Sequence, residues 1–379
     1  MENPEPKRMQ IGEGRISGAL SILLGIISLG GVVCFHFPEY FTTPEFRAAY
    51  SVDFLRKVLL GCLVSSFCFA FLSFLLSKKT RFGLVGIFCS AFALILGGHT
   101  VEVKYFEQSI LSVSLDWLLI DILILSLIFI PLELFFPKHK GQTKFHSEWR
   151  DDLIYFSISH LFVQFTAVAI KAPAELIFSG SGVLVIRDFV VALPFLVQLF
   201  LAMLFSDLFQ YTVHRLFHRL RYLWRFHAVH HSIQSVDWVA GSRLHIVDIL
   251  ITRSLSYLPI YILGVSMPVF YVYIVIVSLQ AVGVHANIRI PFGPLRYLFV
   301  TPQYHHWHHC EDPNLYNKNF AIHFPFIDKI FGTYYLPGEE WPDSTGLGDV
   351  EYPKGYLRQL IYPFFNSPSK GKLSNPSSR

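Results

Sequence analysis

Charged residues are scarce in this chain, and their scarcity excludes several kinds of protein. Asp, Glu, Lys and Arg make up 15% of its 379 residues, while hydrophobic residues make up 53% and the mean hydropathy is +0.45. Soluble globular domains contain about 25% charged residues. The formal charge of +4, with Lys and Arg beside apolar runs, also excludes a nucleic-acid-binding protein. The composition indicates a membrane protein.

Cysteine motifs and cofactor fingerprints are missing as well. The five cysteines show neither CxxC nor short even spacing, so we expect neither a disulfide framework nor a thiolate metal site. The sequence contains no GxGxxG fingerprint after a strand, no P-loop and no haem attachment motif. A redox enzyme with this sequence must therefore take its electrons from a separate donor.

Long apolar runs are what the chain has in abundance. A bilayer core about 30 Å thick requires roughly 17 to 25 apolar residues of helix. Runs of this kind occupy residues 16–37, 56–77, 82–100, 111–136, 153–170, 189–210, 246–266 and 267–284. They predict an all-α fold, a polytopic transmembrane helix bundle. Its last two runs form a hairpin, crossing or re-entrant, because only a short break near Pro268 separates them.

Basic residues predict which side of the membrane each segment faces. Three segments rich in Lys and Arg, at about 7–15, 78–81 and 138–150, are separated from one another by pairs of runs. The positive-inside rule places all three in the cytoplasm. Counting onward places 206–245 and the chain after about 285 there too. We expect a multi-pass protein of the bacterial inner membrane or, in a eukaryote, of the endoplasmic reticulum.

The chain divides by chemistry rather than at a linker. Residues 1–110 carry three runs and no recognisable site, so they are expected to form an N-terminal transmembrane extension. Residues 111–345 hold the other runs and the clustered histidines, and are expected to form the catalytic domain. Residues 346–379 are rich in Pro, Gly, Ser and Lys and predict a partly disordered tail.

Histidine is concentrated in one region, where eleven of the 17 histidines lie between positions 214 and 309. On a helix, residues i and i+4 share a face, so an HxxxH pair can reach one metal site. In HxxHH, positions i and i+3 are expected to share a face while the adjacent histidine points away, so one segment addresses two metals. The groups are His214-x-x-x-His218, His227-x-x-His230-His231 and His305-His306-x-His308-His309, with single histidines at His245 and His285.

Three such groups on one predicted side of a membrane protein favour a metal centre over packing. Imidazole suits Zn, Cu, Fe and Ni, and eight or more histidines exceed the needs of one ion, so two ions are implied. A zinc-binding or metal-transport protein is an alternative of another class, although transport would place ligands near the middle of the spans. A bis-histidine haem protein would need opposed histidines inside the spans, where only His99 and His160 qualify.

The three boxes resemble those of the fatty acid hydroxylase and sterol desaturase superfamily. The resemblance extends to Asp207 and Tyr211 before the first box and to Asn319-Phe320 after the third, and it covers roughly 115–340. It implies a di-iron, O2-dependent oxygenase whose metals lie in a cytosolic cap above a membrane helix bundle. One departure is Asp248, which stands where several relatives carry Glu.

By position, the resemblance implies ten metal ligands. His306 occupies a variable slot of the third box and is not expected to bind metal. Asp207, seven residues before His214, is expected to orient a ligand imidazole through its second nitrogen, unless it is only a charge at the helix end. The implied ligands are His214, His218, His227, His230, His231, His245, His285, His305, His308 and His309.

A lipid is the expected substrate, because the site would lie at the mouth of a membrane bundle. Hydroxylation and desaturation begin with the same hydrogen abstraction, so ligand spacing does not separate them. The layout resembles the branch with alkylglycerol monooxygenase and bacterial lipid hydroxylases, which favours hydroxylation of a fatty acyl, alkyl-ether or sterol-like lipid over desaturation. A cytochrome or ferredoxin-like protein is the expected electron donor. Four polar residues predict a path through the spans: Asp116, Asp121, His160 and Gln164.

Overall fold

The computed structural model describes residues 12–76, 81–103, 106–107, 112–143, 145–161, 178 and 180–366. All regular structure in these ranges is helical, apart from isolated bridges that pair Pro137 with Ile288 and Cys310 with Thr345. The all-α prediction is therefore confirmed for the described residues. The chain separates into two compact units, which we describe in turn.

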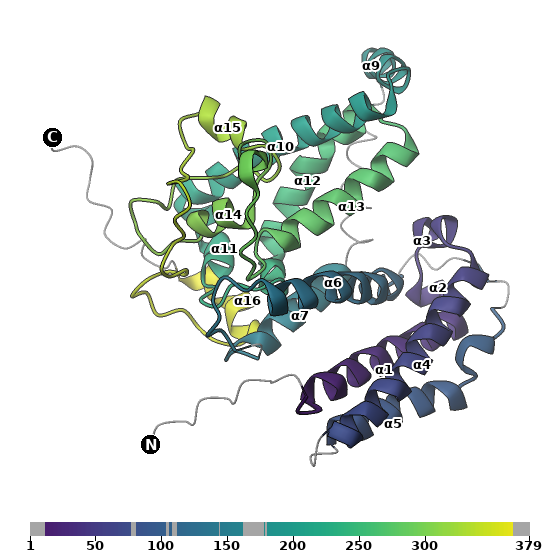
Figure 1. The fold of residues 1–379 in the computed structure, drawn as a ribbon. Helices are drawn as coiled ribbons and strands as arrows, with labels where there is room; N and C mark the ends of the chain where they lie inside the picture. Colours follow the sequence, from purple (N-terminus) through teal and green to yellow (C-terminus); the bar gives the residue numbers. More distant parts are fainter. Residues whose placement is uncertain are drawn as a thin grey trace. The chain divides into compact units, whose positions relative to one another are not determined.

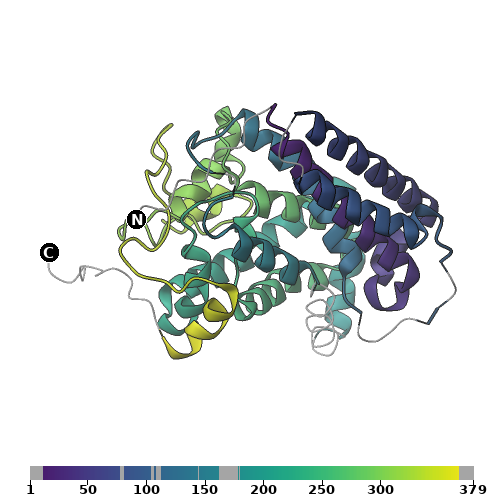
Figure 2. The ribbon, with the colours of Figure 1, turned by 90° about the horizontal axis from the view of Figure 1, so that it is seen from below.

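The first unit comprises Met1–Ile128 with two short segments, 143–145 and 160–164. Its long helices α1, α4 and α5 lie side by side (Figures 1 and 2), and α6 begins in it. The bounds are α1 Arg15–His36, α2 Pro38–Phe41, α3 Pro44–Ala49, α4 Val52–Leu76, α5 Arg81–Ile95 and α6 Leu115–Phe135.

Small residues hold these three helices together. A Cβ added at Gly86 of α5 would lie only 1.9 Å from Ser21 Oγ of α1, so only glycine permits this approach. Ser21 donates to the Ser66 carbonyl at 2.9 Å, Ser66 donates to the Ser21 carbonyl at 2.7 Å, and Ser90 donates to the Ser66 hydroxyl at 2.7 Å. Close backbone approach and interhelical serine bonds are typical of helices packed within a membrane.

The second unit contains every histidine box. In Figure 1, α10, α12 and α13 run together, and α11 and α14 lie near one end of them. Gly264 ends α12 in the left-handed conformation (φ 59°), and Pro268 lies in the first turn of α13, which forms the predicted hairpin. The bounds are α7 Trp149–Leu161, α9 Ser181–Val191, α10 Phe195–Arg219, α11 Arg221–His231, α12 Ile246–Leu263, α13 Met267–Gly283, α14 Pro302–His308, α15 Pro325–Ile330 and α16 Tyr356–Phe365.

Six helical stretches are long and apolar enough to cross a membrane. They confirm the prediction of a polytopic helical membrane protein, whereas eight crossings remain a prediction. The apolar helix α13 has 17 residues, and the part of the run 153–170 beyond Leu161 lies outside the described residues, as does Gln164. The six are α1, α4, Arg81–Thr100, α6, α10 and α12.

The tail contains one helix that the sequence did not predict. Helix α16 packs against α11, where the rings of Phe226 and Phe364 are 5.3 Å apart. The predicted disorder concerned the last dozen residues of the chain, and 367–379 lie outside the described residues. The described part of the tail therefore belongs to the second unit.

Candidate metal centre

The first histidine box lies at the C-terminal end of α10. This helix has 25 residues, and its last two turns carry His214 and His218, both buried. The i, i+4 spacing places their imidazoles on one face, with ring centroids 5.2 Å apart. A single helix thus runs from an apolar candidate span into the site.

The other two boxes lie on short helices. Helix α11 carries His227, His230 and His231 in its last turns. Helix α14 starts at a capping residue, Thr301, whose hydroxyl accepts from the Tyr304 N–H, and proline follows at the first helical position. These start signals place the third box on one turn of helix directly after the cap.

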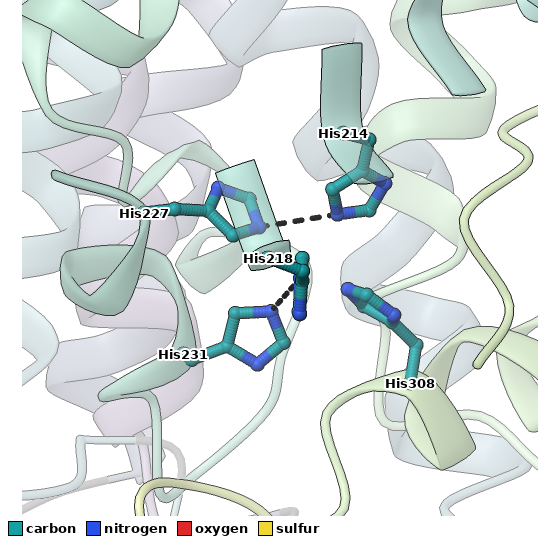
Figure 3. Close-up of side chains that lie close together, drawn as sticks. All are labelled: His214, His218, His227, His231 and His308. Carbon is teal, nitrogen blue, oxygen red and sulfur yellow. Dashed lines mark hydrogen bonds between the residues drawn. The ribbon is translucent and has the colours of Figure 1, made fainter. Parts of the chain in front are cut away.

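The structure gathers nine of the ten predicted ligands into two buried groups. In each group, one ring nitrogen of every histidine lies within 4.8 Å of those of the others. Figure 3 shows the larger group pointing inward around a common centre. The five-histidine cluster is His214, His218, His227, His231 and His308, and the four-histidine cluster is His230, His285, His305 and His309.

The two clusters adjoin, and each HxxHH segment supplies both. The rings of His231 and His309, one from each cluster, stack with centroids 4.6 Å apart. Each HxxHH segment thus contributes histidines to both clusters, whereas the binding of a metal by each cluster stays a prediction. The predicted division was wrong, because His227 and His231 at i and i+4 share a cluster while His230 joins the other. The third box divides in the same way, with His305 and His309 together and His308 apart.

In five of these imidazoles, a main-chain oxygen or a carboxylate determines which ring nitrogen carries the proton. A carbonyl oxygen can only accept, so a neutral histidine whose Nδ1 faces one carries its proton there, and its Nε2 keeps a lone pair. The Asp248 carboxylate does the same for His227, at 2.6 Å from Nδ1. The other four pairs are His214 with Phe320 O, His230 with Arg243 O, His285 with Ala281 O and His308 with Lys318 O, at 2.7 to 3.2 Å.

The resulting lone pairs face one another without a proton between them. His214 Nε2 lies 3.1 Å from His227 Nε2, and His230 Nε2 lies 3.2 Å from His285 Nε2. Buried acceptors ordinarily have a donor, and two facing lone pairs repel. A cation between them would satisfy both, so the donor set fits a metal ion in each cluster.

Burial lowers the pKa of His230, His285, His305 and His308 and so favours their neutral form, which is the form that binds metal. Burial and the neighbouring imidazoles hold the pKa of His230 and of His305 well below the ordinary range. Burial also lowers the pKa of His308 to about 3 and that of His285 to about 4. Near neutral pH the ligands need not lose protons before they bind an ion.

Aromatic side chains enclose the five-histidine cluster. The His218 ring lies 5.0 Å from Phe320 and 5.2 Å from Trp224, and the His227 ring lies 5.5 Å from Phe217, measured between centroids. These aromatic residues are buried. The cluster is therefore shielded from bulk water on this side.

Comparison with known proteins identifies the region that holds this site. Residues 199–333 match the family model described as fatty acid hydroxylase. This segment therefore resembles a fatty acid hydroxylase domain. The match contains every member of both histidine clusters and is narrower than the 115–340 expected from the sequence.

The proteins that are similar to this chain are named for several different activities. The chain is 34% identical over 172 residues to ornithine lipid hydroxylase OlsE of Rhizobium tropici, covering 45% of this chain and 51% of the relative. It is 31% identical over 134 residues to alkylglycerol monooxygenase of Danio rerio, covering 35% of this chain and 30% of that protein. It is 28% identical over 170 residues to very-long-chain aldehyde decarbonylase GL1-10 of Oryza sativa subsp. japonica, covering 44% and 56%.

These alignments are partial. The chain spans between about a third and just over half the length of these curated relatives. No solved structure matches it. The comparisons together with the six apolar helices support an integral membrane protein with a segment that is similar to fatty acid hydroxylases.

One predicted ligand, His245, lies in neither cluster. Its Nδ1 accepts from the Val247 N–H at 3.1 Å and caps the start of α12, and its Nε2 faces the Leu360 carbonyl at 2.9 Å. Both nitrogens are thus occupied by the main chain. The structure therefore does not bring His245 together with the other predicted ligands, and a contact with the tail helix α16 takes its second nitrogen.

Asp207, predicted to orient an imidazole and grouped with the catalytic residues, acts on the main chain instead. Its carboxylate accepts from the backbone N–H groups of Ile322, His323 and Phe324 at 2.7 to 3.0 Å. The preceding stretch of the same loop is held by Asp328, which accepts from the Phe320 and Ala321 N–H groups. Asp207 therefore helps to fix the loop whose Phe320 carbonyl holds His214, without contacting a ligand itself.

Two further residues near the histidine clusters, His306 and Asp248, were considered in the sequence analysis. His306 lies outside both clusters, as predicted, and its ring packs against Trp341 at 5.3 Å. Asp248 holds His227, a role that sequence reasoning missed. The signal was present in the sequence, because an acidic residue follows His245 by three positions.

Proposed function

We propose that this protein is an O2-dependent, di-iron lipid hydroxylase of the membrane. The observation that carries the proposal is the pair of adjoining, buried imidazole clusters whose lone pairs converge at the end of an apolar helix bundle. Relatives named ornithine lipid hydroxylase and alkylglycerol monooxygenase support it. The whole chain's activity, substrate and partners are part of this proposal.

Iron fits the donor set better than zinc does. Protein zinc sites are almost always four-coordinate, whereas one cluster here offers five imidazoles. Imidazole donors with coordination above four suit iron. When bound, two ferrous ions supply O2 activation: one oxygen atom enters the C–H bond, and the other leaves as water with two electrons and two protons from a donor.

The chain's own residues prepare the site for that chemistry. Phe320, Arg243 and Lys318 offer carbonyl oxygens that hold Nδ1 protons, so Nε2 is presented to the ion without rearrangement. Phe217 and Trp224 help to exclude water. Excluding water protects an oxidant strong enough to attack an unactivated carbon.

A lipid substrate follows from the helices that lead to the site. Large apolar side chains of α10, α12 and α13 remain exposed, among them Leu196, Leu255 and Val275. Such surfaces are stable in hydrocarbon. Because α10 also carries His214 and His218, a lipid lying along it has its chain directed at the five-histidine cluster. Electrons would come from a separate cytochrome or ferredoxin-like protein.

Oxygen labelling tests the proposed reaction. Purified protein loaded with Fe2+ is expected to hold two iron atoms per chain. With 18O2, a reductant and a membrane lipid extract, it is expected to yield a lipid heavier by one 18O atom. A product that has lost two hydrogens without gaining oxygen would indicate desaturation, and an alkane one carbon shorter would indicate aldehyde decarbonylation. One zinc atom with no iron-dependent activity would contradict the proposal.

We also propose that the site faces the cytoplasm, on the basis of the three basic segments. In a background without the native cysteines, Asp349→Cys after the third box is expected to react with an impermeant maleimide only when the cytoplasmic side is accessible. Glu45→Cys on α3 is expected to react only from the opposite side. Both side chains are exposed, so each reports its location. Labelling of position 349 from outside in intact cells would reverse the assignment.

A further inference from the structure

A buried ion network lies beside the four-histidine cluster and contributes no ligand to it. Arg243, fully buried, donates through Nε to Asp152 Oδ1 at 2.6 Å and through Nη1 to Glu148 Oε2 at 2.5 Å. Asp152 is fully buried as well, and the His146 ring lies between it and Asp237, at 3.4 and 3.3 Å from their oxygens. The network joins α7 to the turn formed by residues 237–243.

Burying these charges is costly unless the geometry is fixed. Removing a carboxylate and a guanidinium from water costs several kcal/mol each, which pairing offsets only when the remaining hydrogen bonds are good. A hydrophobic core of the same volume would stabilise the fold equally well. Stability alone therefore does not explain the buried ion network, and we ask which residues it holds in position.

The turn 237–243 touches two ligands of the four-histidine cluster. The Arg243 carbonyl oxygen lies 3.2 Å from His230 Nδ1 and sets the direction of that ring. At Gly241 the backbone lies against His285, since an added Cβ would be 2.8 Å from its Nδ1. One face of the turn is thus built against two imidazoles of the same cluster.

Further hydrogen bonds fix the turn from its other side. Asp237 accepts from the Val239 and Ala240 N–H groups at 3.1 and 2.9 Å. Glu133 Oε1 accepts from the Trp238 and Asn287 N–H groups, both at 3.0 Å, and so ties the turn to the chain just after His285. The turn, the network and the His285 segment form one rigid support.

The five-histidine cluster is held by different segments. Its anchors for His214, His227 and His308 are Phe320, Asp248 and Lys318, none of which belongs to the turn or the network. We propose that the buried pairing of Arg243 with Asp152 and Glu148 is a positioning device for the four-histidine cluster alone, acting through the main chain of the turn 237–243. This inference rests on the proposal that both clusters bind metal.

A metal titration of the full-length protein tests the inference without relying on activity. Co2+ added to metal-free protein gives visible absorption that reports coordination, and the wild type is expected to take up two equivalents. Arg243→Lys keeps the positive charge, but a single ammonium group cannot reproduce the two hydrogen bonds that the guanidinium makes to Asp152 and Glu148. It is expected to weaken one equivalent by about 10- to 100-fold, the range for residues that hold metal ligands, and to leave the other unchanged.

A second variant reaches the same cluster without changing any charge. Gly241→Ala places a methyl group against His285 and is expected to weaken the same equivalent as Arg243→Lys. Arg296→Lys makes the same chemical change in an exposed ion pair with Glu339, and is expected to match the wild type. Gly182→Ala, where a Cβ meets nothing within 4 Å, controls for the glycine change.

The outcomes separate this inference from the proposed function. Equal weakening of both equivalents in Arg243→Lys and Gly241→Ala would show a general structural role and overturn the inference. Unchanged binding in both variants would overturn it as well. A wild type that binds fewer than two equivalents would instead contradict the proposed two-metal centre.

Discussion

Replacing His308 by alanine is expected to abolish lipid oxidation, whereas His306→Ala is expected to keep activity within about threefold of wild type. His308 Nδ1 is held by the Lys318 carbonyl, and its Nε2 has no hydrogen-bond partner among the described residues, so it is ready to bind metal. We expect activity to fall at least about 100-fold, the upper end of losses seen for residues that merely hold ligands. His218→Ala and His231→Ala should behave like His308→Ala.

His306→Ala is a matched control because both histidines are buried on the same turn of α14. Removing the His306 ring takes away its contact with Trp341 and is expected to cost about 1–3 kcal/mol of stability. Iron per folded chain should nevertheless stay at two. An inactive, iron-depleted His306→Ala beside an active His305→Ala would show that the third box supplies different ligands from those assigned.

The two clusters are expected to respond differently to the loss of one ligand. His309→Ala leaves three imidazoles in the four-histidine cluster, while His231→Ala leaves four in the other. We expect His309→Ala to weaken one Fe2+ equivalent by more than about 100-fold and His231→Ala by about 10-fold. Both variants should lose lipid oxidation, because the reaction needs both ions.

Anaerobic Fe2+ titration with equilibrium dialysis measures both affinities in each variant. Circular dichroism at the same protein concentration establishes that helix content is unchanged. If His231→Ala and His309→Ala weakened the same equivalent, the division of the HxxHH segments between two clusters would be incorrect. If His305→Ala resembled His231→Ala rather than His309→Ala, the same conclusion would follow.

The spacing of the histidines was sufficient to predict the nine residues that gather in the two clusters, and helix geometry explains the one error in their division. Three residues advance a helix by about 300° and four by about 400°, so i+4 lies closer to the starting direction than i+3 does. His227 therefore pairs with His231 rather than with His230. The sequence contained this information, and the wrong offset was chosen from it.

Contacts between distant segments are what the sequence did not reveal. His245 lies in neither cluster, and its Nε2 faces the Leu360 carbonyl, which lies on the unexpected helix α16. Asp207 is occupied by backbone N–H groups more than a hundred residues later. Most anchors of the imidazoles are carbonyl oxygens, such as that of Lys318, which any residue type supplies.

The division of neighbouring histidines between the clusters also means that the peptide chain itself sets the spacing of the two clusters. His230 and His231 are neighbours in α11, and His308 and His309 are neighbours at the end of α14, yet each pair divides between the clusters. Successive residues in a helix are related by a fixed rise of about 1.5 Å and a fixed rotation. If two ions occupy the clusters as proposed, these short helices would carry both of them as one unit, and the distance between the ions would stay constant when the surrounding bundle bends.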